Sequence, residues 1–193
     1  MKSHVHYEAA FEDYLQTHQI PYVAVDEAKR AAFRDAKLKS FDFIVYSAGG
    51  PNWLVDIKGR RWAARPTRPR SSVGGRSAAN GPAPARRPRA RRAGSRPSWQ
   101  NWVTQADLEG LRQWEEVFGE GFRALLVFAY RLECAGAPPA EVVHEFRDAR
   151  YVFAGIPVRE YELHARIRSP KWGTVNVPVA EFARQVRPMA EWL

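Results

Sequence analysis

Three charged residues interrupt two apolar runs between residues 41 and 60, and their types and spacing suit metal-assisted chemistry. Asp42 lies in the first run, and Asp56 and Lys58 lie in the second. Carboxylates are costly to bury unless they are paired or bound to a metal ion. Ligand sets made of oxygen atoms alone suit Mg²⁺ or Mn²⁺. The two runs therefore indicate a divalent-cation site, provided that the fold brings the two carboxylates together.

The segment between the two runs, Ser-Ala-Gly-Gly-Pro-Asn at 47–52, is typical of a turn, and it predicts a β-hairpin. If residues 48–50 form the loop, Asp42 faces Asp56 directly, with Cβ atoms about 4.5–5.5 Å apart. Lys58 lies two residues after Asp56 and therefore shares its face. We expect one face to carry Asp42, Ile44, Tyr46, Leu54, Asp56 and Lys58. The other face would carry Phe41, Phe43, Val45, Trp53, Val55 and Ile57.

The same three charges also allow a purely structural explanation. Lys58 would then form a buried ion pair with Asp42 or Asp56 and would only tie the sheet together. One of the two carboxylates would remain unpaired in that arrangement, which is unfavourable. The metal site is therefore the favoured interpretation, with the structural ion pair as its alternative.

The length and composition predict one soluble domain over residues 1–193. The chain has 10 Phe, 7 Tyr and 7 Trp, enough aromatic residues for a substantial core. Its one cysteine, Cys134, excludes an internal disulfide bond and a cysteine metal cluster, which suits a reducing compartment. No apolar run approaches the roughly 20 residues of a membrane span, and no secretory leader is apparent. We therefore expect a cytoplasmic protein.

The net charge of +9 comes from one segment. Residues 61–97 contain 11 Arg, 6 Pro and 4 Gly, without lysine or acid, whereas the rest of the chain has 19 basic and 21 acidic residues. Such a low-complexity segment is expected to be a disordered insertion within the domain. It would bind nucleic acid through phosphates without reading sequence, or it would be a solvated insertion with no such role.

Hydrophobic periodicity predicts the remaining elements. The apolar stripe of Tyr7, Phe11, Tyr14 and Leu15 predicts a helix over 5–18, and Thr104 with Asp107 resembles a capping box that opens a second helix. Residues 122–132 read as a central strand buried on both faces. Further expectations are a short strand at 22–25, a polar helix or loop at 26–39, the second helix ending at Gly119, an antiparallel pair of strands at 151–153 and 158–167, and a short helix at 179–186.

The order helix, strand with Asp, strand with Asp-x-Lys, helix, strand resembles the PD-(D/E)xK nuclease superfamily. In addition, residues 6–12, His-Tyr-Glu-Ala-Ala-Phe-Glu, match the pattern that names the HYExAFE family of bacterial proteins. The superfamily resemblance covers roughly 4–60 and 102–131, and the heptapeptide identifies a family without identifying a reaction. The resemblance implies an α/β fold with a restriction-endonuclease-like core, a mixed central sheet flanked by helices.

The resemblance also implies roles for particular residues. Asp42 and Asp56 would be metal ligands, and Lys58 would position or activate the attacking water. Glu8 would complete the metal site from the first helix, although a solvated helix flank explains it almost equally well. Glu12 is a weaker candidate for the same place, and Gln105 would be an accessory residue, for which a structural role is favoured. The chain has Asp56 where glutamate is commoner in the superfamily, and no proline precedes Asp42.

Several basic and aromatic residues are candidates for contacts with nucleic acid. Lys29, Arg30, Lys37 and Lys39 would line a phosphate groove beside the site, unless they are merely solvated. Three tryptophans in the second half of the chain would stack on bases, although core packing is the favoured explanation for them: Trp99, Trp102 and Trp114.

These observations predict a metal-dependent nuclease that hydrolyses phosphodiester bonds. The cofactor would be Mg²⁺ or Mn²⁺, because divalent ions neutralise the charge that develops on phosphate oxygens. DNA is the expected substrate and partner, RNA stays open, and a homodimer would allow two strands to be cut. The alternative from another class is an inactive module on the same fold that binds nucleic acid or protein.

Overall fold

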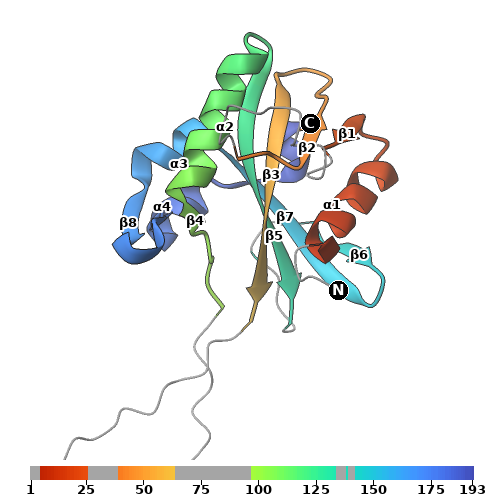
Figure 1. The fold of residues 1–193 in the computed structure, drawn as a ribbon. Helices are drawn as coiled ribbons and strands as arrows, with labels where there is room; N and C mark the ends of the chain where they lie inside the picture. Colours follow the sequence, from red (N-terminus) through yellow and green to blue (C-terminus); the bar gives the residue numbers. More distant parts are fainter. Residues whose placement is uncertain (1–4, 26–38, 64–96, 134–137, 139–141) are drawn as a thin grey trace, which may run out of the picture.

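The computed structural model describes residues 5–25, 39–63, 97–133, 138 and 142–193. Within these residues a central mixed sheet has helices on both faces (Figure 1). The strands are β1 (Tyr22–Ala24), β2 (Phe43–Val45), β3 (Asn52–Trp62), β4 (Val103–Thr104), β5 (Phe122–Leu132), β6 (His144–Phe146), β7 (Ala149–Pro157), β8 (Arg166–Ser169), β9 (Thr174–Asn176) and β10 (Arg187–Pro188). The α-helices are α1 (Val5–Thr17), α2 (Gln105–Phe118), α3 (Val158–His164) and α4 (Val179–Gln185), and the 3₁₀ turns are η2 (Pro170–Trp172) and η3 (Met189–Trp192).

The main sheet has the order β1-β2-β3-β5-β7-β10, and β6 pairs with β7 outside this path. Its centre is the long parallel pair of β3 and β5, while the other neighbours are antiparallel. Parallel strands need a crossover connection, and α2 lies within this one. A second, small sheet of β4, β9 and β8 lies beside α2 (Figure 1). The segment after β3 thus returns to the sheet through α2.

Two apolar clusters lie on opposite faces of the sheet. On one face α1 packs against residues that include Phe43, Val55 and Val127. On the other face α2, α3 and α4 pack against residues that include Leu54 and Leu126. Alternate residues of β3 and β5 thus belong to different clusters, which explains why both central strands are buried on both sides.

Helix α1 lies directly on the backbone of β3. A Cβ atom placed on Gly59 would lie only 2.2–2.6 Å from ring atoms of Tyr7, so the ring occupies the space above this glycine. The Tyr7 hydroxyl also donates a hydrogen bond of 3.2 Å to the carbonyl oxygen of Arg60. Only a residue without a side chain allows so close an approach of a helix to a strand. Gly59 therefore fixes where α1, and with it Glu8, lies relative to the hairpin.

Most of the predicted elements are confirmed. The helices at 5–18, 104–118 and 179–186, the strand at 22–25 and the central strand at 122–132 are present with bounds that differ by no more than two residues. The hairpin is present, and its register is the predicted one, with Phe43 opposite Val55 and Val45 opposite Trp53.

Four details of the sequence analysis are corrected. Residues 158–164 form helix α3 instead of a strand, because Val158 and Tyr161 are buried at helical spacing after Pro157. Strand β7 pairs with β5, β6 and β10 instead. The insertion begins later than residue 61, because β3 continues to the buried Trp62.

The other two corrections concern the hairpin faces, because Phe41 and Tyr46 lie outside β2. Phe41 belongs to the cluster on the α2 side, and Tyr46 is 40% exposed.

Two further expectations lie outside the described residues. They are the polar segment at 26–38 and residues 64–96 of the arginine-rich segment. Among the helices that the structure describes, none combines the length and the apolar character needed to cross a membrane.

Candidate active site

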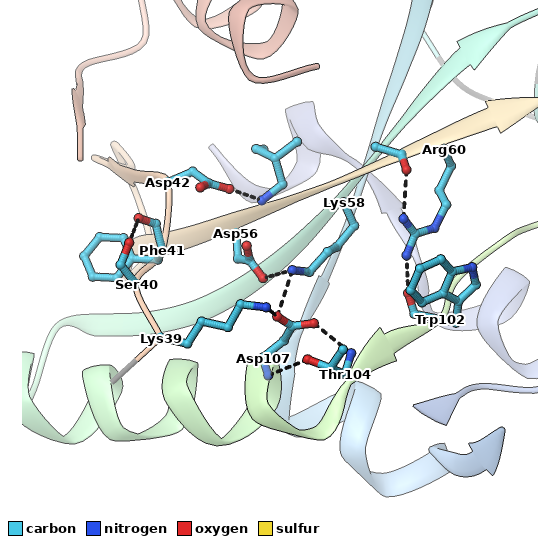
Figure 2. Close-up of polar contacts among 12 residues, drawn as sticks. Lys39, Ser40, Phe41, Asp42, Asp56, Lys58, Arg60, Trp102, Thr104 and Asp107 are labelled. Carbon is cyan, nitrogen blue, oxygen red and sulfur yellow. Dashed lines mark hydrogen bonds and ion pairs between the residues drawn. The ribbon is translucent and has the colours of Figure 1, made fainter. Parts of the chain in front are cut away.

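The hairpin brings Asp42 close enough to Asp56 for the charge of one carboxylate to act on the other. The paired register ends with Phe43 opposite Val55, and the Asp42 N–H donates a hydrogen bond of 2.8 Å to the carbonyl oxygen of the same Val55. Asp42 is therefore not in the predicted register directly opposite Asp56, because two residues of the first strand meet one residue of β3 here. The Asp42 carboxylate accepts a hydrogen bond of 2.6 Å from the N–H of Ile57 (Figure 2). Asp42 is therefore held to β3 by both its backbone and its side chain, beside Asp56.

Burial and charge both act on Asp42. Burial, followed by the neighbouring charge of Asp56, raises the pKa of Asp42 to about 8. The hydrogen bond from Ile57 and the charge of Lys58 act in the opposite direction, and the charge of Glu8 raises the pKa further. Two buried carboxylates repel each other when both are ionised. A cation between them would remove this repulsion.

Lys58 pairs with Asp56 on the same face of β3. Its Nζ lies 2.6 Å from Oδ2 of Asp56 and 3.1 Å from Oδ1 of Asp107, with only 13% of the lysine side chain exposed. The ion pair with Asp56 is the contact that the structural explanation of the sequence predicted. The contact with Asp107 adds a carboxylate that the sequence analysis did not place here.

Asp107 has two tasks at the start of α2. Its Oδ2 accepts a hydrogen bond of 2.7 Å from the Thr104 N–H, and its own N–H donates to Thr104 Oγ1 at 3.1 Å, which completes the predicted capping box. The remaining oxygen, Oδ1, faces Lys58 and Lys39 (Figure 2). The capping motif was visible in the sequence, but nothing in it revealed that the same carboxylate would contact the lysine of the hairpin.

Lys39 reaches the site from the segment just before the hairpin. Its ammonium group pairs with Asp107, and its carbonyl oxygen accepts a hydrogen bond of 3.0 Å from Trp114 Nε1. A Cβ atom on Gly110 would lie 3.0 Å from the carbonyl oxygen of Lys39, so this segment lies flat on α2. Of the four basic residues expected in a phosphate groove, only Lys39 lies within the described residues, and it is 43% exposed.

The glutamates of α1 occupy different surroundings. Glu8 is half-buried and close enough for its charge to act on Asp42. Glu12 lies one turn further along the helix and accepts a hydrogen bond of 2.9 Å from the Tyr22 hydroxyl. The structure thus brings Glu8 towards the two aspartates, while Glu12 contacts β1.

The other predicted residues lie elsewhere. Gln105 is exposed at the start of α2, where its N–H donates to the carbonyl oxygen of Gly173 at 2.8 Å, and its side chain lines a cavity with Glu109 and Arg112. Lys29, Arg30 and Lys37 lie outside the described residues. Trp99 and Trp114 pack against other aromatic rings, as expected for core residues.

The donor atoms at the hairpin suit a hard divalent cation. Asp42 and Asp56 offer carboxylate oxygens only, and Mg²⁺ is usually held by one or two carboxylates together with water and substrate phosphate. Among the described residues, no three His, Cys, Asp or Glu side chains form a ready-made metal cage. A chelating site of the zinc type is therefore not seen in the described parts, whereas a two-carboxylate site is compatible with the geometry.

Comparisons with known proteins support the fold. No protein-family model and no curated protein matches the sequence. A solved structure does match, that of Hjc, a Holliday junction resolvase from the archaeal hyperthermophile Archaeoglobus fulgidus. The TM-score is 0.51 at 11% sequence identity, over 97% of this chain and 98% of the resolvase. At this identity the match concerns the fold, and the fold of this chain is the restriction-endonuclease-like one that its sequence predicted.

Proposed function

We propose that this protein is a metal-dependent nuclease that hydrolyses phosphodiester bonds, with DNA as its substrate. The observation that carries the proposal is the gathering of Asp42, Asp56 and Lys58. The Asp42 carboxylate is bonded to the N–H of Ile57, the residue between the other two, and Lys58 lies 2.6 Å from Asp56. The fold shared with a Holliday junction resolvase supports the choice of DNA. The match of residues 6–12 to the HYExAFE pattern fits the same proposal but does not identify a reaction.

In this proposal Asp42 and Asp56 hold a Mg²⁺ or Mn²⁺ ion, with Glu8 completing the set from α1. The ion would supply positive charge where phosphate oxygens become more negative during cleavage. The raised pKa of Asp42 fits this role, because a cation would favour the ionised carboxylates, whose charges otherwise repel each other.

Lys58 would act on the attacking water. An ammonium group has three N–H donors, and the ion pairs with Asp56 and Asp107 account for two of them. The third is available to orient a water molecule or a phosphate oxygen beside the carboxylates. Positioning and fixed charges of this kind provide most of the catalysis in such sites.

Cleavage assays with substituted proteins test the proposal. Asp42→Ala and Lys58→Ala should each abolish Mg²⁺-dependent cleavage of DNA, because each removes part of the site. The matched control is Asp148→Asn, which changes an exposed aspartate at the turn between β6 and β7. Circular dichroism should show that all three variants are folded. Undiminished cutting by both site variants would reject the assignment.

A second candidate is supported by the same ion pairs. Lys58 is held by two carboxylates, as it would be in an inactive module whose charges serve only the fold. Titration calorimetry with Mg²⁺ or Mn²⁺ separates the two candidates. Heat of binding that disappears in Asp42→Ala supports the nuclease, and an absence of binding together with retained affinity for nucleic acid supports the inactive module.

A further inference from the structure

A cavity of about 370 Å³ opens next to the hairpin site. It is lined by Trp102, Thr104, Arg168, Ser169, Trp172 and Thr174. Thr104 connects it to the site, because this residue caps α2 together with Asp107, the partner of Lys58. The volume lies within the range of small-ligand pockets. The cavity is thus linked to the hairpin site through the start of α2.

A buried positive charge without an acidic partner among the described residues lies against Trp102, one of the residues that line the cavity. Arg60 is only 8% exposed, and within the described parts of the chain its guanidinium donates hydrogen bonds to the carbonyl oxygens of Gly59 and Trp102 alone. Its Nε has no hydrogen-bond partner among the described residues, and no described acid forms an ion pair with it. A buried charge without a counter-charge is unfavourable. The surroundings of Arg60 therefore favour an anion.

A second guanidinium lies close to the same ring. Arg60 lies 4.2 Å and Arg168 5.5 Å from the centre of the Trp102 ring. The two positive charges are close enough for Arg168 to contribute, after burial, to a lowered pKa of Arg60. Arg168 is exposed on β8 and forms no ion pair with a described acid. Bringing two such groups together is unfavourable unless a negative ligand compensates, and the guanidinium fork matches the geometry of a phosphate group.

The rim of the cavity adds an exposed aromatic surface. Trp172 is 71% exposed, and Lys171 lies over its ring at 5.6 Å. The stretch 166–173 contains three basic residues and no acid. Exposed aromatic rings among basic side chains are typical of surfaces that bind single-stranded nucleic acid, because bases stack on the rings while the charges follow the phosphates. In an intact duplex the bases are already stacked on one another, so a ring of this kind selects nucleotides that are unpaired.

We propose that this cavity binds an unpaired nucleotide of the DNA strand that is cleaved, with its base on Trp172 and its phosphate on Arg168. The inference rests on the proposed nuclease function and narrows its substrate class to DNA with a branch, a flap or a single-stranded end. Arg60, which lies against the ring of Trp102, adds to the positive potential in the cavity.

Fluorescence anisotropy in the absence of divalent ions measures this binding without cleavage. The probes are a labelled DNA duplex with a single-stranded flap, the blunt duplex, and the same flap made of RNA. The protein should bind the DNA flap more tightly than the blunt duplex. Trp172→Ala should weaken binding of the flap about 5- to 150-fold, the range for loss of one base stack. Trp172→Phe, which keeps a ring, should retain most of the affinity.

Arg168→Ala should also reduce the salt dependence of flap binding, by about 0.7 in the slope of the double-logarithmic plot. Two control variants make similar substitutions at positions away from the cavity. Val117→Ala alters an exposed apolar residue at the other end of α2, and Arg147→Ala alters an arginine stacked on Phe146. Both should bind the flap like the unmodified protein. The exposure of Trp172 and Arg168 means that their variants should also melt at the original temperature.

The outcomes are distinguishable. If the protein binds none of the DNA probes at low salt, the nuclease proposal itself fails. If it binds them but Trp172→Ala and Arg168→Ala change nothing, the nucleotide subsite is wrong and the nuclease proposal is unaffected. An equal loss on flap and blunt duplex rejects the unpaired nucleotide, and a preference for the RNA flap rejects DNA. Light scattering provides the last check, because a dimer that dissociates in Trp172→Ala would assign this surface to a second copy of the chain.

Discussion

Asp42 is the residue whose surroundings say most about the site. It lies near a second aspartate, it is partly buried, and a backbone N–H holds its carboxylate in place. Burial and the neighbouring carboxylate raise its pKa to about 8. The folded protein thus prefers this carboxyl group protonated, unless a positive ion balances the pair. This preference leads to a prediction about stability.

Without metal, the melting temperature should fall as the pH rises from about 4 to about 8. Asp42 has a higher pKa in the folded state than the value of 3.8 for an ordinary aspartate. Its contribution to stability is therefore fully present below the unfolded pKa and is lost as the pH passes through the folded pKa. Thermal unfolding in a chelating buffer across this pH range measures the effect.

Mg²⁺ should restore part of the lost stability at pH 8 and very little at pH 5, because it binds the ionised carboxylates. In Asp42→Asn, which cannot ionise, both the decline with pH and the response to Mg²⁺ should be smaller. If the melting temperature of Asp42→Asn depended on pH and on Mg²⁺ as it does in the unmodified protein, the role of Asp42 would be contradicted.

Asp107 caps α2 and also pairs with Lys58 and Lys39, and substitutions can separate these two tasks. Asp107→Asn keeps an oxygen that can accept the Thr104 N–H but removes the charge that faces Lys58 and Lys39. Asp107→Ala removes both. The alanine variant should therefore be less stable than the asparagine variant by about 1 kcal/mol, the usual contribution of a cap. Chemical denaturation measures this difference.

The cleavage rates of the same two variants test the second task. If Asp107 orients Lys58, both variants should cleave DNA more slowly than the unmodified protein, and by similar factors. A normal rate in Asp107→Asn would show that the carboxylate serves the helix alone.

At the scale of elements, the close approach of α1 to β3 positions Glu8, the carboxylate that α1 brings towards Asp42. The Tyr7 ring lies against Gly59, within a distance that no Cβ atom tolerates. Gly59→Ala should therefore displace the helix and lower the free energy of unfolding by about 1–3 kcal/mol, as for other overpacked sites. Urea denaturation measures the change.

Gly49→Ala is the matched control for Gly59→Ala, because no atom lies within 4 Å of the added methyl group. Its effect should stay within about 0.5 kcal/mol. Combining Gly59→Ala with Tyr7→Ala should cost less than the sum of the two single changes, because the collision is gone. Strict additivity would show that the ring and the glycine do not determine the position of α1.

The elements also show which features a single sequence reveals. The register of the hairpin was predictable, because a short turn and two alternating runs leave one pairing that buries both apolar faces. The capping box of α2 was predictable as well, because its pattern is local. Helix α3 was misread as a strand, since its seven residues are too few to distinguish helical spacing from alternation when β-branched and aromatic residues are mixed.

The contacts that complete the site were beyond such an analysis. Asp107 lies 49 residues after Lys58 in the sequence, and only the crossover through α2 brings the two together. Trp172 and Arg168 lie in a short hairpin whose place beside Trp102 depends on the small sheet. Contacts between residues that are far apart in the sequence depend on how the elements pack. The pattern of residue types in a single sequence does not reveal that packing.

At the scale of the whole molecule, residues 64–96 separate two parts of one fold. The strand before them ends in Trp62, whose ring lies 5.3 Å from that of Trp99 on the other side of the segment. The two ends are therefore close, and a short Gly/Ser linker can join them. Replacing residues 64–96 by such a linker should leave a single cooperative thermal transition, and a broadened or lost transition would show that the segment is part of the fold.

The bounds of this deletion matter. Removing residues 62–97 instead would also take out Trp62, which is 6% exposed and packs against Tyr130. Loss of a buried tryptophan costs about 3–5 kcal/mol. The longer deletion should thus be clearly less stable than the shorter one in the same denaturation experiment, although both remove the arginine-rich segment.

The capping box couples the formation of α2 to the contacts of Lys58, because both depend on Asp107. The Asp107 carboxylate caps the first turn of α2 and also pairs with Lys58. A chain in which this turn has unwound therefore lacks the ion pair between Asp107 and Lys58. Exchange of the Thr104 and Asp107 amide hydrogens with deuterium would report directly on how often this turn unwinds. The proposed nuclease would acquire its complete site only after the crossover through α2 has folded, so partly folded chains should leave DNA intact.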